Sequence, residues 1–293
     1  MKLTFLGIGQ MGLGMAARLA QAGLNICVYN RTIEKCAPLR EMGATVASTP
    51  MEAVANAGII FTMLSDDAAL QSVMNTEVIK RMPEDAIHIS MSTISVALSA
   101  QMSKEHTAMG RAYLACPVFG RPDAAAAGQL RLCMAGNLAH KEKVMPYLSP
   151  MGKVWDFGES PENANAVKLA GNFMICSMVE LLSEAFLLVE NNGVPPGKFA
   201  QFISSTLFAA PIVQLYSQLI LHADFDNPGF TARLAAKDMS LVRSAAKQSK
   251  TLMPFSKIVE ERFLEAIKKG LGEKDMTIIS RAPHGNVARP MPG

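Results

Sequence analysis

The sequence has few charged residues and no long uninterrupted apolar segment. Charged residues occupy 18% of the 293 positions, below the roughly 25% of an average soluble chain. The hydrophobic fraction of 49% excludes a disordered protein, which combines low hydrophobicity with high charge. Glu180 and Glu184 interrupt the most apolar stretch, residues 172–190, so no uninterrupted apolar run reaches the roughly 18 residues that span a bilayer. We therefore expect no membrane segment. The length of 293 residues suits one large domain or two modest ones.

Features of secreted, metal-binding and nucleic-acid-binding proteins are also scarce. Met1-Lys2 leads directly into an apolar strand, without the long apolar region and cleavage site of a signal peptide. The net charge is only 28 − 25 = +3, without the clustered Lys and Arg that bind nucleic acid. No His or Cys residues have metal-ligand spacing. The five cysteines are scattered and odd in number, which favours reduced thiols in the cytoplasm. They are Cys27, Cys36, Cys116, Cys133 and Cys176.

The pattern of predicted elements changes along the chain. Short apolar runs alternate with helical patterns in the first half, which predicts a parallel sheet covered by helices on both faces. Expected strands are 2–6, 25–29, 59–64, 86–90, 113–118 and 130–135, and expected helices there include 12–22, 51–56 and 68–74. After about residue 157 only helical patterns remain, at 163–192, 196–205, 211–223, 234–248 and 254–269.

This change predicts two domains. We expect an α/β Rossmann domain over residues 1–160 and an all-α domain over 161–280, joined by a long interdomain helix. Residues 281–293 are rich in Pro and Gly and are expected to form a loose tail.

A glycine-rich motif stands directly after the first predicted strand. Gly7-Ile8-Gly9-Gln10-Met11-Gly12 satisfies G-x-G-x-x-G and opens a helix, the context that marks a dinucleotide-binding turn. Gly7 would permit the tight turn, Gly9 would let the backbone approach a pyrophosphate, and Gly12 would allow close helix–strand packing. The phosphates would lie at the helix N-terminus.

The end of the second strand indicates which dinucleotide binds. Sites that prefer NAD place Asp or Glu there to accept a hydrogen bond from the ribose 2′-hydroxyl. This chain has Asn30-Arg31-Thr32 instead, and an Arg beside two short polar side chains suits a 2′-phosphate. We predict NADP as the cofactor, with NAD less favoured; the alternative is that Arg31 is an ordinary solvated residue.

A lysine near the start of the long helix is the candidate catalytic group. Lys168 and Asn172 are four residues apart and share one helix face. Their neighbours Val167, Leu169 and Phe173 are apolar, and a desolvated lysine can act as an acid or base near neutral pH. Spacing alone leaves a snorkelling lysine as an equal alternative.

Taken together, these motifs resemble the β-hydroxyacid dehydrogenases, the family of 3-hydroxyisobutyrate dehydrogenase and the glyoxylate/succinic semialdehyde reductases. The resemblance extends to about residue 272. It includes the opening Phe5-Leu6-Gly7-Ile8-Gly9-Gln10-Met11-Gly12, the loops Met63-Leu64-Ser65 and Met91-Ser92-Thr93-Ile94, the K-x-x-x-N motif at Lys168 and Asn172, the pair Lys237-Asp238, and Phe230.

The resemblance implies roles for these residues. Lys168 would be the general acid for carbonyl reduction, with Asn172 positioning the substrate. Cofactor contacts would come from the glycine loop with Gln10 and Met11, from Met63, Leu64, Ser65 and Thr93, and from Lys237. Substrate contacts would involve Ser92, Phe119, Gly120, Arg121, Phe230 and Asp238. Without the resemblance, Ser92 and Thr93 could equally be helix caps. The family also implies a homodimer or tetramer built from the helical domain, and hydride transfer in an interdomain cleft.

The substrate loop departs from the family pattern. The family reads D-A-P-V-S-G-G where this chain has Ala115-Cys116-Pro117-Val118-Phe119-Gly120-Arg121. Phe119 replaces the small hydroxyl residue that helps to hold a substrate carboxylate, and Arg121 replaces the second glycine. Gly120 backbone groups and Arg121 could still bind an acid, or Phe119 could form an apolar wall for another substrate.

These observations favour an NADP-dependent oxidoreductase that interconverts a small β-hydroxyacid, or a related alcohol, with its aldehyde or keto form. An imine reductase is an alternative, although those relatives generally lack the lysine. A 6-phosphogluconate dehydrogenase would have His before the Asn, where this chain has Gly171. A non-catalytic NADP-binding sensor is the alternative from a different class.

Overall fold

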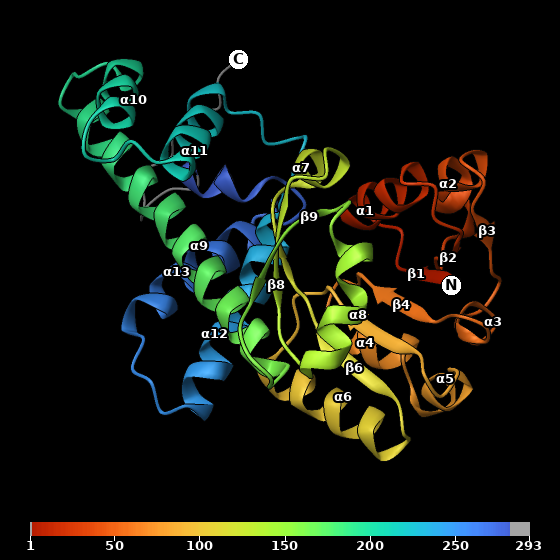
Figure 1. Cartoon of the computed structure of the whole chain (residues 1–293). Helices are drawn as coiled ribbons and strands as arrows, with labels where there is room; N and C mark the ends of the chain where they lie inside the picture. The colour runs from red at the N-terminus through yellow and green to blue at the C-terminus, as the bar shows by residue number, and fades with distance from the viewer. Residues whose placement is uncertain (1, 282–293) are drawn as a thin grey trace. The chain divides into compact units, whose positions relative to one another are not determined.

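The computed structural model describes residues 2–281. Contacts divide the chain into two compact units, with the division between Lys168 and Leu169. The first unit contains every strand of the described residues, and the second is helical (Figure 1). This is the predicted arrangement of a Rossmann-type α/β region followed by an all-α region.

The first unit is built on a six-stranded parallel sheet. Its strands lie in the order β3-β2-β1-β4-β5-β6, which is the Rossmann order with a topological switch beside β1. In register, Leu6 at the end of β1 lies beside Tyr29 of β2 and Thr62 of β4. The strands are β1 (Leu3–Leu6), β2 (Ile26–Tyr29), β3 (Thr45–Val46), β4 (Ile59–Thr62), β5 (Ile87–Ser90) and β6 (Ala112–Ala115).

Two apolar clusters cover the two faces of this sheet. Successive side chains of a strand point to opposite faces, so Leu3 and Phe5 belong to one cluster and Leu6 belongs to the other. The first cluster includes buried residues of α1 (Gln10–Gln21), α2 (Ala37–Glu41) and α8 (Leu138–Leu148). The second includes residues of α3 (Pro50–Val54), α4 (Asp67–Val73), α5 (Thr76–Arg81) and α6 (Val96–Ala108).

Side-chain caps fix where several of these helices begin. The side chain of Thr49 accepts from the backbone at the start of α3, and Asp66 does the same for α4. Asn75, Ser95 and Asn137 cap α5, α6 and α8. Such caps satisfy backbone N–H groups that have no partner within the helix. A short 3₁₀ turn, η1 (Ile33–Cys36), leads into α2.

A second, three-stranded sheet follows β6. It comprises β7 (Val118–Phe119), β8 (Leu130–Met134) and β9 (Gly152–Asp156), with α7 (Pro122–Ala126) between the first two. The expected single strand over 113–118 is therefore two strands in different sheets. Pro117 lies between them, and a proline cannot donate to a strand ladder. Phe119 pairs with Arg131 in the antiparallel β7–β8 ladder.

A pair of histidines is buried between the large sheet and α6. His88 Nδ1 lies 3.0 Å from His106 Nε2, and His88 Nε2 lies 3.0 Å from Thr62 Oγ1. His106 Nδ1 lies 2.7 Å from the carbonyl oxygen of Met102. The Tyr113 ring packs against both imidazoles. Burial lowers the pKa of His88 well below its ordinary value, with His106 lowering it further, and burial lowers the pKa of His106 to about 4.

The second unit contains the remaining helices. The long helix α9 (Glu162–Asn191) begins in the first unit and continues into the second. Within the second unit a buried ion pair joins α9 to the helix α13 (Pro254–Lys268), because Arg262 Nε donates to Glu180 Oε1 at 2.8 Å. The other elements are α10 (Pro196–Ser205), α11 (Pro211–His222), α12 (Ala232–Gln248), α13 (Pro254–Lys268) and the 3₁₀ turn η2 (Met276–Ser280).

By length and composition alone, α9 is apolar enough to cross a membrane. A core helix of a soluble protein meets the same criterion. The buried ion pair of Glu180 with Arg262 packs this helix against protein rather than leaving the carboxylate toward lipid. The expected loose tail, apart from Arg281, lies outside the described residues.

Candidate active site

The glycine loop after β1 is packed too closely for side chains at two positions. Gly7 has φ +101°, and a Cβ there would lie 2.3 Å from the carbonyl oxygen of Met63. A Cβ on Gly12 would lie 1.9 Å from the carbonyl oxygen of Gly7. These contacts give Gly7 and Gly12 the tight-turn and close-packing roles that the motif predicts.

The remaining glycine of the motif leaves space at the start of α1. A Cβ on Gly9 would meet nothing within 4 Å. Gly9 is also the N-cap of α1, and no side chain of the described residues caps this helix. Its first N–H groups and the positive end of the helix dipole can therefore receive a phosphate. Gln10 is exposed and Met11 is half-buried in this first turn. The loop thus fits the pyrophosphate of a dinucleotide.

Asn30 connects this loop to the end of β2. Its side chain accepts from the backbone N–H of Ile8 at 2.9 Å and donates to the carbonyl oxygen of Thr32 at 2.8 Å. Arg31 and Thr32 are exposed beside it. The amide of Asn30 thus shapes the turn, and Arg31 is an exposed cation beside it; its contact with a ribose 2′-phosphate stays a prediction.

The predicted loops after β4 and β5 are joined by a serine. Ser92 is fully buried, and its Oγ accepts from the backbone N–H of Leu64 at 2.8 Å. Its hydroxyl also lies 3.4 Å from the carbonyl oxygen of Thr62. Ser92 therefore holds the start of the Met63-Leu64-Ser65 loop in place, and its role in substrate binding stays a prediction. Thr93, the next residue, is half-buried.

Lys168 is buried in the first unit against an aromatic ring. Its residue is only 8% exposed, and its Nζ lies 4.1 Å from the centre of the Phe119 ring. A cation at this distance from a ring face is attracted by the ring quadrupole. The charge of Lys168 also affects the thiol of Cys133 in β8. Burial raises the pKa of this thiol, and the Lys168 charge partly opposes that rise.

The rest of the substrate loop follows Phe119 directly. Gly120 is exposed with φ +139°, and a Cβ there would lie 2.6 Å from Leu130 Cδ2. Only glycine suits this backbone. Arg121 is half-buried and is the N-cap residue of α7. Phe119, Gly120 and Arg121 thus lie in the same unit as Lys168, although only Phe119 has a described contact with it.

Asn172, predicted to position the substrate, is itself held by a carboxylate. Within the second unit its Nδ2 donates to Asp238, which is 1% exposed. Lys237 Nζ lies 2.9 Å from Asp238 Oδ1. Asp238 therefore joins Asn172 of α9 to Lys237 of α12, a supporting role that the sequence did not indicate. Phe230 is half-buried just before α12.

Sequence reasoning missed a further polar residue on α9. Asn165 lies one turn before Lys168, is 1% exposed, and neither polar atom of its amide has a hydrogen-bond partner among the described residues. Its spacing from Lys168 places the two residues on one helix face. That spacing was visible in the sequence, but an Asn close to a helix start is more typical of an exposed cap.

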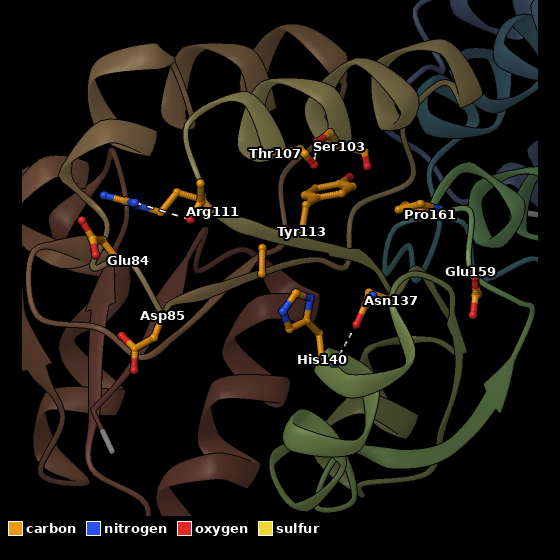
Figure 2. Close-up of a pocket in the computed structure, with 12 residues that line it drawn as sticks. Glu84, Asp85, Ser103, Thr107, Arg111, Tyr113, Asn137, His140, Glu159 and Pro161 are labelled. Atoms are coloured by element: carbon orange, nitrogen blue, oxygen red, sulfur yellow. Dashed lines mark hydrogen bonds between the residues drawn. The ribbon is translucent and has the colours of Figure 1, made fainter.

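The first unit also has a polar hollow of about 490 Å³, far along the sheet from the glycine loop. Asp85 precedes β5 and Arg111 precedes β6, so the hollow lies at the amino ends of strands whose carboxyl ends face the predicted ligands. Figure 2 shows Arg111 extended toward Glu84, and Asn137 and His140 at the start of α8. No predicted site residue lines it.

Comparisons with known proteins identify the family of each unit. Residues 2–167 match the family model described as the NAD binding domain of 6-phosphogluconate dehydrogenase. Residues 163–282 match the model described as NAD-binding of NADP-dependent 3-hydroxyisobutyrate dehydrogenase. Together the two models span the α/β unit and the helical unit.

Curated and solved relatives cover nearly the whole chain. It is 39% identical to the uncharacterized oxidoreductase YfjR of Bacillus subtilis, over 94% of this chain and 97% of the relative. It is 30% identical to glyoxylate/succinic semialdehyde reductase 2 of Arabidopsis thaliana, over 96% and 78%. The solved 3-hydroxyisobutyrate dehydrogenase of Mycobacterium tuberculosis has the same fold, with a TM-score of 0.87, 23% identity, and coverage of 96% and 98%.

The chain belongs to the 3-hydroxyisobutyrate dehydrogenase-like family of NAD(P)-dependent dehydrogenases, which act on small hydroxyacids and related carbonyl compounds. It is therefore an oxidoreductase with a dinucleotide-binding first unit.

Proposed function

We propose that the protein is an NADP-dependent oxidoreductase that interconverts a small carbonyl compound and the corresponding alcohol or β-hydroxyacid. The observation that carries this proposal is the buried Lys168 on the helix that also carries Asn172. A buried cation that retains a proton is suited to general acid catalysis.

The residues of the first unit fit the cofactor. Gly7, Gly9 and Gly12 form the loop that would receive the pyrophosphate, and Arg31 would bind the 2′-phosphate bidentately. The rest of the cofactor site would be lined by Met63, Leu64, Ser65 and Thr93. When bound, NADPH supplies the hydride.

Lys168 would carry the proton transfer. In the reductive direction its Nζ gives a proton to the carbonyl oxygen while the carbonyl carbon receives the hydride, so an alcohol and a neutral amine result. In the oxidative direction the neutral amine takes the hydroxyl proton. Asn172, oriented by Asp238, would hold the substrate oxygen, and Lys237 would contribute positive charge beside it.

The proposed function is tested by measuring whether the protein reduces a panel of carbonyl compounds. We expect NADPH oxidation, followed at the absorbance of the reduced nicotinamide, with at least one of glyoxylate, succinic semialdehyde, tartronate semialdehyde and an uncharged aldehyde. A cyclic imine is included to test the imine reductase alternative. NADPH binding without turnover of any compound would instead support the sensor alternative.

The cofactor preference has its own expected outcome. Arg31→Gln should weaken NADPH binding by about 10–100-fold, because a charge-assisted hydrogen bond contributes about 1.5–3 kcal/mol. NADH binding should change little, since NADH lacks the 2′-phosphate. The matched control is Arg40→Gln, another exposed arginine of the same unit. Equal losses for NADPH and NADH, measured by fluorescence titration, would contradict the assignment of Arg31.

The imine reductase alternative is less well supported, because Lys168 is present and buried. The sensor alternative rests on Phe119 and Arg121 in the substrate loop. We therefore favour carbonyl chemistry over both.

We also propose that the protein is a homodimer through its helical unit. Met174, Leu181 and Leu188 of α9 are exposed and spaced by two helical turns, which forms an apolar stripe. Exposed apolar groups of this kind are typical of interfaces. A cytoplasmic location is supported by the five buried cysteines, none of which forms a disulfide within the described residues.

A further inference from the structure

Asn165 places an unpaired amide in the interior of the protein. The residue is 1% exposed, and among the described residues neither its Oδ1 nor its Nδ2 has a hydrogen-bond partner. Burying such an amide opposes folding, because its polar atoms give up their hydrogen bonds to water. Native proteins keep few groups of this kind, and each one needs an explanation such as a catalytic role. The place of Asn165 on α9 indicates what its amide can bind.

Helix geometry directs the side chain of Lys168 toward Asn165. Residues three apart lie on one face of a helix, and here both are buried, whereas Ala166 between them is exposed. Long side chains on a helix lean toward its N-terminus and cover the preceding turn. The side chain of Lys168 therefore extends back over the turn that contains Asn165. Both residues belong to the first unit.

The chemistry of the two groups is complementary. An ammonium has three N–H donors, and an amide oxygen is an uncharged acceptor. The Phe119 ring, 4.1 Å from Lys168 Nζ, attracts the ammonium through its whole face and does not fix the direction of a single N–H bond. Lys168 has interactions besides this one. The oxygen of Asn165 has no hydrogen bond of its own, so it can be added to them.

We propose that Asn165 is a positioning residue for Lys168: its amide oxygen accepts a hydrogen bond from the ammonium and directs another N–H toward the substrate carbonyl. This inference rests on the proposed function, in which Lys168 is the general acid. In the structure the ammonium lies against the Phe119 ring, so the bond forms when rotation of the two side chains moves the ammonium toward Asn165. The proton passes from Nζ to the carbonyl oxygen, and Asn165 neither gains nor loses one.

The variant Asn165→Leu separates this role from a structural one. Leucine has a similar volume and no polar atom, so it removes the unpaired amide and should raise the melting temperature by about 2–4 °C. The same change should lower kcat for carbonyl reduction by about tenfold, the effect of one hydrogen bond to a charged group. NADPH binding should stay unchanged. The matched control, Asn163→Leu, alters an exposed asparagine of the same helix and should retain the natural kcat.

A series of acceptors at position 165 tests the contact with the ammonium. Reductive turnover falls at alkaline pH when the general acid loses its proton, and an acceptor that binds the charged form delays this loss. The midpoint of the fall should therefore rise from Asn165→Leu through the natural protein to Asn165→Asp, in steps of about one pH unit. A packing defect would lower kcat without ordering the midpoints. The measurement is the rate of hydride transfer from NADPH to the best compound of the carbonyl panel.

Chemical labelling of Lys168 provides the same test without turnover. Acetic anhydride modifies a neutral amine, so the pH dependence of its reaction with Lys168 in the full chain, followed by mass spectrometry, gives the same midpoint. Equal midpoints in the three proteins would overturn this inference and leave the oxidoreductase assignment standing. Equal midpoints with weaker NADPH binding in Asn165→Leu would overturn it by assigning the amide to the cofactor. Ordered midpoints without turnover of any carbonyl compound would overturn the proposed function, while the contact between Asn165 and Lys168 would stand.

Discussion

Replacing Lys168 with Ala is expected to lower kcat for carbonyl reduction by about 10²–10⁴-fold, the usual contribution of a positioned general acid. The dissociation constant for NADPH should stay within about threefold of that of the natural protein, because the glycine loop and Arg31 are unchanged. Stopped-flow measurement of hydride transfer and fluorescence titration of NADPH would provide both values.

Two further variants make this result specific. Lys168→Arg keeps a positive charge, but its guanidinium does not release a proton near neutral pH, so it should be nearly as inactive as the alanine variant. Lys143→Ala removes an exposed lysine of α8 and should retain full activity. If Lys168→Ala kept its rate, the proton would have another source and the assigned mechanism would be wrong.

The buried histidine pair should make the first unit unstable in acid. The pKa of His106 is lowered by burial to about 4 in the folded protein, whereas an unfolded chain titrates near the ordinary value of 6.5. As pH falls below about 6.5, the His106 imidazole binds a proton in the unfolded state but stays neutral in the folded state until the pH approaches 4. Stability is thus lost with falling pH, by about 3 kcal/mol from His106 alone by pH 4. His88 adds a loss of the same sign.

Denaturant unfolding between pH 7 and pH 4 would measure this loss. His106→Gln should flatten the dependence of the unfolding free energy on pH, even if the variant is less stable at pH 7. His222→Gln removes an exposed histidine of the second unit and should leave the dependence unchanged. A pH dependence that is unchanged in His106→Gln would assign the acid sensitivity to groups other than His106.

Elements with a clear apolar period were predicted close to their observed bounds. The strands β1, β2, β4, β5 and β6 of the large sheet and α9 to α13 agree with the expected ranges within a few residues, whereas the two-residue strand β3 (Thr45–Val46) was not predicted. Helix α6 was missed because its buried face continues from Leu98 and Met102 to His106, so a polar residue occupies an apolar position. Helix α8 was missed because it contains Pro146. Strand β9 was missed because it is short and most of its residues are exposed, so it has no apolar run.

In the candidate site, too, some features follow from the local sequence and others depend on contacts between distant residues. The glycine loop could be predicted because local chemistry dictates it: a tight turn needs glycine. The role of Arg31 toward a 2′-phosphate stays a prediction. The contacts of Lys168 with Phe119 and of Asn172 with Asp238 join residues far apart in the chain. Local periodicity contains no information about such pairs. The burial of Ser92 beneath the Leu64 loop likewise depends on the neighbouring strand.

The two hydrogen bonds of Asn30 have a consequence for how cofactor preference can change. One atom of its amide accepts from Ile8 of the glycine loop, and the other donates toward Thr32. An aspartate, the residue that binds an unphosphorylated ribose, could keep the first bond but would set a carboxylate against the Thr32 carbonyl. Under the proposed preference for NADP, a switch to NAD at this position would therefore also disturb the turn proposed to receive the pyrophosphate. In this chain, an exchange at position 30 would change the ribose end of the proposed cofactor site and the conformation of the glycine loop together.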